Sequence, residues 1–297
     1  MYNTKTIKHF TMIHLKKLTY AYRRKPALFD SLDLHLTPGQ TYGLLGRNGV
    51  GKTSLLHILS GLLFPQSGEV TVMGFEPRRR QQAFLADLYF LAEDPYIPPV
   101  RIRGLLRMYA PFYPSFDEAY FEDMIHAFGL DINQHLSRLS FGERKKVMIA
   151  FGLATRCRLL LMDEPTNGLD IPSKKQFREL IAGAIEPDQI ILLSTHQVRD
   201  LRGLIDSVII LEDGQIVLQE SQEGIGERLS LQFQLRAPAV GECLYSEHTG
   251  SGYVCLKPMT EDADSLEIDL EVLFNAVILQ PETFQNLFRK TVDFGNR

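Results

Sequence analysis

The stretch GRNGVGKTS at residues 46–54 constrains the fold of this chain more than any other feature. It fits the pattern G-x-x-x-x-G-K-[ST] and lies between a predicted strand at 41–45 and a predicted helix at 54–63, which is the context that this pattern requires. Its glycines permit tight turns, so successive backbone N–H groups can wrap around phosphate oxygens. The stretch therefore predicts a phosphate-binding loop between a strand and a helix of an α/β sheet.

Two side chains at the end of this loop carry chemistry of their own. Lys52 is expected to reach the β- and γ-phosphates of a nucleotide, and the hydroxyl of Thr53 is expected to ligate Mg²⁺. A glycine-rich turn that binds nothing is the alternative, and the Lys-Thr pair at a helix start after a strand argues against it. The loop alone predicts nucleotide binding and no particular reaction.

A pair of carboxylates ends the apolar run RLLLMDEP at 158–165. A buried strand delivers the residues that follow it to the carboxyl edge of the sheet, where ligands bind in α/β folds. We expect Asp163 to hold Mg²⁺ through water and Glu164 to polarise the attacking water as a general base. The alternative is a pair of solvated loop acids, which suits an isolated Asp-Glu pair better than one that follows such a strand.

Only one of the eight histidines, His196, closes an apolar strand, IILLSTH. At the edge of the sheet its imidazole is expected to hydrogen-bond the γ-phosphate and to sense its loss. A structural role is the alternative for a lone histidine. The position of His196 after a third such strand favours the functional role.

A second helix start lies in LSFGERKKV at 139–147. The free backbone N–H groups of such a start, with a Ser hydroxyl and a Gly that lets the chain approach closely, form an anion site. The chain therefore has two predicted anion sites, and the phosphate loop alone does not explain the second.

The patterning along the chain predicts the order of its elements. Apolar and polar residues alternate at 13–36, which indicates half-buried antiparallel strands. Strands alternate with helices from 158 to 204, which implies a mainly parallel sheet, and a hairpin then turns at Asp213-Gly214. The stretch 101–136 is helical, and its aromatic residues are expected to form a subdomain core. The pattern from 221 to 297 is typical of a small α+β appendage.

Composition limits the partners and the compartment. A net charge of −4 provides no basic field for nucleic acid, and 44% hydrophobic residues are typical of a globular protein. Three widely spaced cysteines without metal-site spacing predict reduced, mostly buried thiols in the cytosol. No run reaches the roughly 18 apolar residues of a membrane span. Met12 directly precedes the first patterned strand, so residues 1–11 are expected to be a disordered lead or an added segment.

Four motifs in order resemble those of the nucleotide-binding domain of ABC transporters: the phosphate loop, LSFGE (139–143), LLLMDEPTNGLD (159–170) and STH (194–196). The resemblance covers about residues 12–220, with a helical subdomain at about 84–157, and leaves 221–297 as a C-terminal extension of unknown role. It implies an α/β P-loop NTPase fold of ABC type, with an antiparallel β subdomain and a helical subdomain.

This resemblance assigns roles residue by residue. The implied nucleotide-binding residues are Tyr22, Gly46, Asn48, Gly49, Val50, Gly51, Lys52, Thr53 and Ser54. The implied catalytic residues are Lys52, Glu164 and His196, and the implied metal ligands are Thr53, Asp163 and Glu93. Tyr22 is expected to stack on adenine, and Tyr20 is the other candidate for this role. For both residues, the alternative role is ordinary packing within a strand. Asp170 closes the segment NGLD, which resembles the D-loop.

The resemblance also explains the second anion site, at the helix start in 139–147. There, two domains sandwich two ATP molecules head to tail, and LSFGE resembles the signature motif that contacts the γ-phosphate of ATP held by the other subunit. Ser140, Gly142 and Glu143 are therefore implied to act in trans. ATP and Mg²⁺ are the implied cofactors, and hydrolysis removes the ATP that joins the two subunits.

The implied partners are a second nucleotide-binding subunit, as a homodimer or heterodimer, and a separate transmembrane permease chain, with no nucleic acid. The implied location is cytoplasmic, peripheral on the cytoplasmic face of the cell membrane. The short helical insert is similar to that of exporter-type subunits. The segment 93–116 is expected to dock the permease, and the alternative is that its residues only pack the helical subdomain. The alternatives are a soluble ABC-type ATPase and an ATP-dependent switch not coupled to transport. A single domain without heptads or a basic stripe argues against the first.

Two motifs depart from the family pattern. The signature is usually Ser-Gly-Gly-Gln, whereas here Phe141 replaces the first glycine and Glu143 adds a carboxylate near the phosphates. The Q-loop position within FLAEDPYIPP (90–99) carries Glu93 instead of Gln. A carboxylate can ligate Mg²⁺, but an ionised one cannot donate a hydrogen bond. We predict slower hydrolysis than is usual for the family, and an unchanged rate in Glu93→Gln would contradict this.

Overall fold

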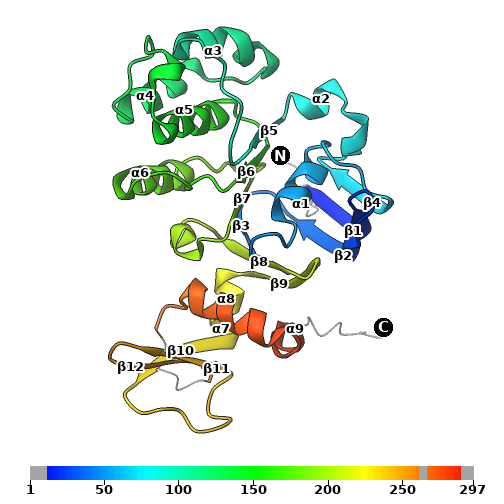
Figure 1. Cartoon of the computed structure of the whole chain (residues 1–297), viewed down its shortest axis with the longest axis vertical. Helices are drawn as coiled ribbons and strands as arrows, with labels where there is room; N and C mark the ends of the chain where they lie inside the picture. The colour runs from blue at the N-terminus through cyan, green and yellow to red at the C-terminus, as the bar shows by residue number, and fades with distance from the viewer. Residues whose placement is uncertain (1–11, 261–265, 289–297) are drawn as a thin grey trace, which may run out of the picture.

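The computed structural model of the chain describes residues 12–260 and 266–288. A central sheet has the antiparallel strands and helix α1 (Lys52–Leu59) on one side and a group of helices at one end of the molecule (Figure 1). The C-terminal elements, yellow to red in Figure 1, lie at the opposite end of the long axis. The lead predicted for residues 1–11 lies outside the described residues, as do parts of the 221–297 stretch.

The central sheet has the spatial order β5 (Leu88–Leu91), β6 (Leu159–Asp163), β7 (Ile190–Thr195), β3 (Gln40–Leu45), β8 (Ser207–Glu212) and β9 (Gln215–Ser221). Neighbouring strands from β5 to β8 are parallel, and β9 pairs antiparallel with β8. The predicted mainly parallel sheet and the hairpin at Asp213-Gly214 are both confirmed. The carboxyl ends of β3, β6 and β7 therefore meet at one edge of the sheet.

Both faces of this sheet are buried. Leu159 and Leu161 of β6 belong to an apolar cluster shared with α1 and the antiparallel strands. Leu160 and Met162 belong to a second cluster, shared with α5 (Phe141–Ala154) and α6 (Ile171–Ala182). Because successive side chains of a strand point to opposite faces, a strand covered on both sides needs a continuous apolar run. This explains why four apolar residues precede the carboxylate of Asp163 in β6.

The antiparallel subdomain consists of β1 (Ile13–Ala21) between β2 (Ala27–Leu36) and β4 (Ser67–Val72), as the alternation predicted. The helix α1 ends at Leu59, four residues short of the predicted end at 63. The reason is Gly61, which takes a φ of 69° and leaves no room for a Cβ beside the carbonyl oxygen of Pro77. Glycine adopts this left-handed conformation at low cost and so ends helices.

Before the helical subdomain, η1 (Pro77–Arg79) contacts α1 and β4, and α2 (Gln82–Leu85) places Phe84 in the apolar cluster of α1 and the antiparallel strands. The helical subdomain contains α3 (Ile102–Tyr109), α4 (Glu118–Ala127) and α5, with 3₁₀ turns η2 (Ala110–Phe112) and η3 (Leu136–Arg138). Its aromatic residues pack around Phe151 of α5, with Phe116 at 4.9 Å between ring centroids. The predicted aromatic core is therefore confirmed, with one exception. Phe112 in η2 is 68% exposed, because the chain turns outward between α3 and α4.

The element after β7 is shorter than expected. The sequence predicts a helix at 197–204, whereas the chain forms one 3₁₀ turn, η4 (Val198–Leu201), before it enters β8. Gly203 follows with a φ of 67°, a conformation that an α-helix cannot continue through. This segment follows His196 directly.

The C-terminal elements are α7 (Gln222–Arg228), β10 (Leu229–Gln234), β11 (Tyr245–Thr249), β12 (Gly252–Pro258), α8 (Leu270–Leu279) and α9 (Pro281–Phe288). The three strands form an antiparallel sheet in the order β10-β12-β11. Strands and an amphipathic helix match the α+β pattern predicted here, and α7, β11 and α9 were not predicted. Ser221 ends β9 and caps α7, so no linker separates these elements from the central sheet.

Two further predictions concern composition. Within the two described ranges, no helix is long and apolar enough to cross a membrane. Cys157 and Cys255 are buried, Cys243 is partly exposed, and all three are free thiols. Burial raises the pKa of Cys157 to about 12, which makes its thiol unreactive.

Candidate active site

The phosphate loop runs from the end of β3 to the first turn of α1. Gly49 and Gly51 take φ values of 86° and 115°, a left-handed backbone that favours glycine. A Cβ at Gly51 would lie 2.8 Å from the ring of Phe29, and one at Gly46 would lie 2.6 Å from the carbonyl oxygen of Leu211. Backbone conformation and lack of space therefore both require glycine in this loop.

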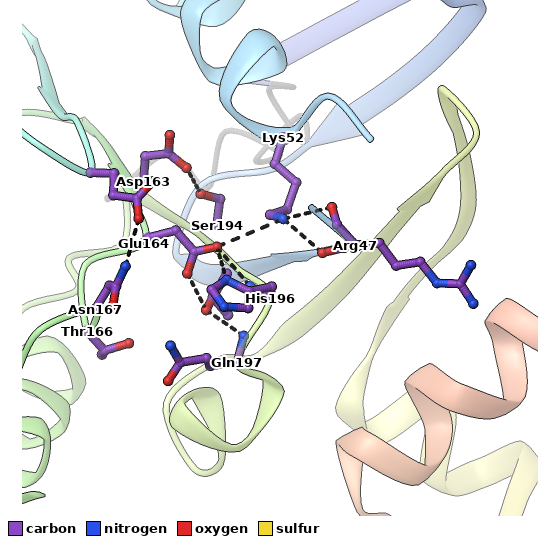
Figure 2. Close-up of polar contacts among 12 residues, drawn as sticks. Arg47, Lys52, Asp163, Glu164, Thr166, Asn167, Ser194, His196 and Gln197 are labelled. Carbon is purple, nitrogen blue, oxygen red and sulfur yellow. Dashed lines mark hydrogen bonds and ion pairs between the residues drawn. The ribbon is translucent and has the colours of Figure 1, made fainter. Parts of the chain in front are cut away.

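Lys52 is the first residue of α1, and its side chain is buried. Its Nζ donates to the carbonyl oxygens of Gly46 (2.8 Å) and Arg47 (3.1 Å), and lies 3.9 Å from Oε1 of Glu164 (Figure 2). Burial lowers the pKa of Lys52, and the carboxylate of Glu164 is the main opposing influence. The ammonium is thus held between the phosphate loop and the end of β6, where it can also contact an anionic oxygen.

Asp163 ends β6, and its neighbour across the strand pair is Ser194 of β7. Oδ2 of Asp163 accepts a hydrogen bond of 2.6 Å from Thr53 Oγ1, and Oδ1 accepts one from the Ser194 hydroxyl. Figure 2 shows the aspartate and serine side by side at the sheet edge. Two of the predicted metal ligands, Thr53 and Asp163, are therefore in direct contact.

Glu164 lies at a sharp turn after β6, with a φ of 45°. Its carboxylate accepts from Thr195 Oγ1 (2.8 Å) and from the backbone N–H of His196 (2.9 Å). Nδ1 of His196 lies 2.7 Å from Oε1 of the same carboxylate (Figure 2). A non-glycine residue in this left-handed region costs about 1–3 kcal/mol and is typical of functional sites. The turn brings the Glu164 carboxylate back to face both His196 and Lys52.

These side chains line one cavity of about 600 Å³, a volume common for small-molecule sites. The predicted site residues in its lining are Tyr22, Asn48, Gly49, Gly51, Lys52, Thr53, Ser54, Glu93, Asp163, Glu164 and His196. The predicted residues Gly46 and Val50 are absent from this lining. Gly46 instead packs against the backbone of Leu211 and the side chain of Val50.

The two candidate aromatic residues differ in exposure. Tyr22 is 41% exposed at the cavity, and its hydroxyl lies 2.8 Å from Ser54 Oγ. Tyr20 is buried behind it, with ring centroids 5.1 Å apart in an edge-on arrangement. Tyr22 therefore has a surface that faces the cavity, whereas Tyr20 supports Tyr22 from the core.

Glu93 follows β5 and lines the same cavity. Its Oε1 accepts a hydrogen bond of 2.7 Å from Nδ2 of Asn167, in the loop after β6. The carboxylate thus connects two loops at the edge of the sheet. A glutamine at this position would keep the same acceptor oxygen.

The residues of the LSFGE motif lie outside this cavity's lining. Ser140 caps α5: its Oγ accepts from the backbone N–H of Glu143, and the Glu143 carboxylate accepts from the backbone N–H of Ser140 over 2.7 Å. This reciprocal pair is a capping box, and its hydrogen bond lowers the pKa of Glu143. Gly142 lies in the first turn, where a Cβ would be 3.0 Å from the carbonyl oxygen of Gly168.

Asp170 also lies outside the lining and caps a helix, because its Oδ1 accepts from the backbone N–H of Ser173 at the start of α6. Sequence reasoning missed Lys25 in the lining and the bonds of Ser194 and Thr195 to the two carboxylates. The signal that could have predicted these bonds is the pair of hydroxyl residues, Ser194 and Thr195, directly before His196. It also missed Lys145, whose ammonium donates to the main-chain carbonyl oxygens of Glu93, Glu164 and Asn167. Lys145 stands among consecutive basic residues, and the sequence gives no signal that sets it apart from them.

Comparison with known proteins agrees with this geometry. A model of the ABC transporter family matches residues 29–167. The chain is 31% identical to the uncharacterized ABC transporter ATP-binding protein YdbJ of Bacillus subtilis, over 72% of this chain and 70% of that protein. It is 31% identical to the putative ABC transporter ATP-binding protein AlbC of the same organism, over 69% and 90%.

A solved ATP-binding subunit of an ABC transporter superposes with a TM-score of 0.63 at 24% identity, over 72% of this chain and 92% of that structure. At this identity the superposition establishes the fold alone, which is the predicted ABC-type nucleotide-binding fold with its β and helical subdomains. The sequence relatives establish the family. This chain belongs to the ABC transporter ATP-binding proteins, the ATPase subunits that work with transmembrane permeases.

Proposed function

We propose that this chain hydrolyses Mg²⁺-bound ATP in the cavity described above, with Glu164 as general base, Lys52 as a phosphate ligand and His196 as the contact that senses the γ-phosphate. The observation that carries this proposal is the position of the Glu164 carboxylate. It is buried, held by Thr195 and His196, and lies 3.9 Å from the Lys52 ammonium. A base fixed beside a phosphate-binding cation is the arrangement that phosphoryl transfer to water needs.

Mg²⁺ is proposed to bind at Thr53 and Asp163, with Glu93 as a further ligand. Hydroxyl and carboxylate oxygens are hard ligands of the kind that Mg²⁺ prefers, and Mg²⁺ usually keeps several waters. Within residues 12–260 and 266–288, no three His, Cys, Asp or Glu side chains form a group that could hold a metal ion. We propose that few protein oxygens hold the ion and that phosphate and water complete its coordination. When bound, it would neutralise charge that develops on the phosphates.

The working unit is proposed to be a head-to-tail dimer. Ser140 and Gly142 lie outside the lining of their own chain's cavity, at the N-terminal end of α5. A helix N-terminus carries partial positive charge and free N–H groups, so it attracts phosphate. In the dimer, the ATP held in one cavity would contact the start of α5 of the other subunit. The partner in this dimer is a second nucleotide-binding subunit, identical or different.

The permease is proposed to dock beside the helical subdomain, at the cytoplasmic face of the membrane. A hollow of about 670 Å³ lies there, and its lining includes Leu62, Leu85, Phe90 and Phe112. In the segment 93–116, Tyr96 is 80% exposed and Phe112 is 68% exposed. Phe112 lines this hollow, whereas Tyr96 lines a separate one beside Phe141. Exposed aromatic residues are typical of interaction sites. We propose the exporter-like type from the short helical insert and the single nucleotide-binding domain.

The test is ATP hydrolysis and molecular mass, measured together on the native chain and on Glu164→Gln, with Glu122→Gln in the exposed part of α4 as control. We expect Glu164→Gln to lose about 10²–10⁴-fold in hydrolysis while it still binds ATP and accumulates as an ATP-bound dimer. The control should hydrolyse like the native chain. A native chain that binds ATP without hydrolysis, even with its permease, would contradict the proposal.

A further inference from the structure

Lys145 is a buried cation to which the proposed mechanism gives no role. It lies in the second turn of α5 and is only 1% exposed. Its Nζ donates to three main-chain carbonyl oxygens, those of Glu164 (2.6 Å), Glu93 (3.2 Å) and Asn167 (3.2 Å). An ammonium has three N–H donors, so these three bonds satisfy all of them. The side chain therefore joins α5 to the loops that follow β5 and β6.

The bonds of Lys145 reach residues of the active site itself. Glu164 is the proposed base, and Glu93 and Asn167 are bonded to each other through their side chains. Burying a charge is costly, and a buried lysine needs full hydrogen bonding to offset the cost. If the helix moved relative to these loops, Lys145 would lose its bonds, so helix and loops are expected to move together.

A second contact connects the same parts. Phe141, in the first turn of α5, covers Gly168 so closely that a Cβ there would lie 2.6 Å from its ring. The Lys145 ammonium lies 5.6 Å from the centroid of that ring. The start of α5, which carries Ser140 and Gly142, is thus packed against the loop after β6.

We propose that Lys145 is a positioning residue that couples the two ATP sites of the dimer. This inference rests on the proposed head-to-tail arrangement. ATP of one subunit binds the start of α5 in the other, five residues or about 7.5 Å along the helix from Lys145. Lys145 transmits the resulting position of α5 to the main chain of Glu164, so each base is correctly placed when the partner's ATP is in contact.

The experiment compares Lys145→Met with Lys146→Met, the neighbouring lysine whose side chain is partly exposed and lies over the ring of Phe128. Four quantities are measured for the native chain and both variants: ATP affinity with a fluorescent ATP analogue, hydrolysis as a function of ATP concentration, dimer mass with ATP, and the melting temperature. Methionine keeps the length and the apolar stem of lysine and removes its donors.

We expect native hydrolysis to be cooperative, with a Hill coefficient that approaches about two, and Lys145→Met to lower it to about one. The kcat of Lys145→Met should fall by up to about 10²-fold, because a misplaced base loses that much, while ATP affinity stays close to native. Lys146→Met should behave like the native chain in all four measurements.

Two outcomes would overturn the coupling role of Lys145. One is a Lys145→Met that keeps its cooperativity and kcat. The other is a parallel loss of ATP affinity, kcat and melting temperature, which would indicate a purely structural lysine. If Lys145→Met does not fold, Lys145→Gln, which keeps two donors, is judged by the same criteria. A native chain that does not dimerise with ATP would instead contradict the proposed dimer, and the coupling role would fall with it.

Discussion

The nucleotide cavity and the C-terminal elements use polar side chains in opposite ways. Lys52, Asp163 and Glu164 are buried around the cavity. In the described part of the chain beyond residue 220, Ser230 is the only buried polar side chain. Ion pairs there lie at the surface, such as Arg236 with Glu242 at 2.8 Å. Because buried charges are costly, the burial of these three around one cavity indicates that they serve the reaction.

The C-terminal elements are nevertheless part of the same apolar core. Ile225, Leu273 and Phe284 belong to the cluster that contains Leu201 of η4 and Leu193 of β7. On the surface, Arg199 of η4 is paired with Glu271 of α8. The two regions therefore share one continuous apolar core and differ in the polar side chains that they bury. A boundary between domains at residue 220 stays a prediction.

The largest expected effect is that of Lys52→Met. Removing the ammonium takes away the cation next to Glu164 and the ligand proposed for phosphate, so hydrolysis should fall by at least about 10²-fold. ATP affinity, measured by equilibrium binding, should fall as well. Arg236→Met, which breaks an ion pair among the C-terminal elements, is the control and should hydrolyse at the native rate. Equal losses in both variants would remove the contrast between the two regions.

Phe284→Ala is expected to change stability without changing chemistry. The ring is fully buried in α9, and truncation of such a residue costs about 3–5 kcal/mol of the free energy of unfolding. Urea unfolding measures this loss, and kcat is measured under conditions where the variant remains folded. Leu279→Ala, at an exposed position of α8, should lose far less. A reduced kcat in folded Phe284→Ala would give the C-terminal elements a part in the reaction.

Glu93→Gln is expected to raise hydrolysis several-fold. The substitution removes a negative charge from the cavity and keeps the oxygen that accepts from Asn167. The new amide can also donate a hydrogen bond to a water or phosphate oxygen, which an ionised carboxylate cannot do. Steady-state phosphate release at saturating ATP measures the effect. An unchanged or lower rate would show that the carboxylate at this position does not slow this ATPase.

Much of the cavity could be predicted because its residues follow patterns that fold the chain. Asp163 ends β6 and His196 directly follows β7, and parallel strands bring their carboxyl ends to one edge of the sheet. Lys145 could not be predicted in this way, because neighbouring basic residues in a helix give no signal of which one is buried. The strand β11, YSEHT, lacks apolar alternation and was missed. Its place depends on pairing with β12, a contact that local sequence does not encode.

The smallest expected effect is that of Glu143→Gln, which restores the usual signature residue. Gln fills a capping box as Glu does, so at neutral pH stability should change by about 0.5 kcal/mol or less, and hydrolysis should stay near native. The hydrogen bond from Ser140 lowers the pKa of Glu143 below its ordinary 4.5. The carboxylate's contribution to stability is therefore complete above that value and is lost as pH falls through the lowered pKa. Urea unfolding over an acid pH series should show Glu143→Gln losing less stability than the native chain, and a marked change in neutral-pH hydrolysis would mean that the Glu143 charge acts on the phosphates directly.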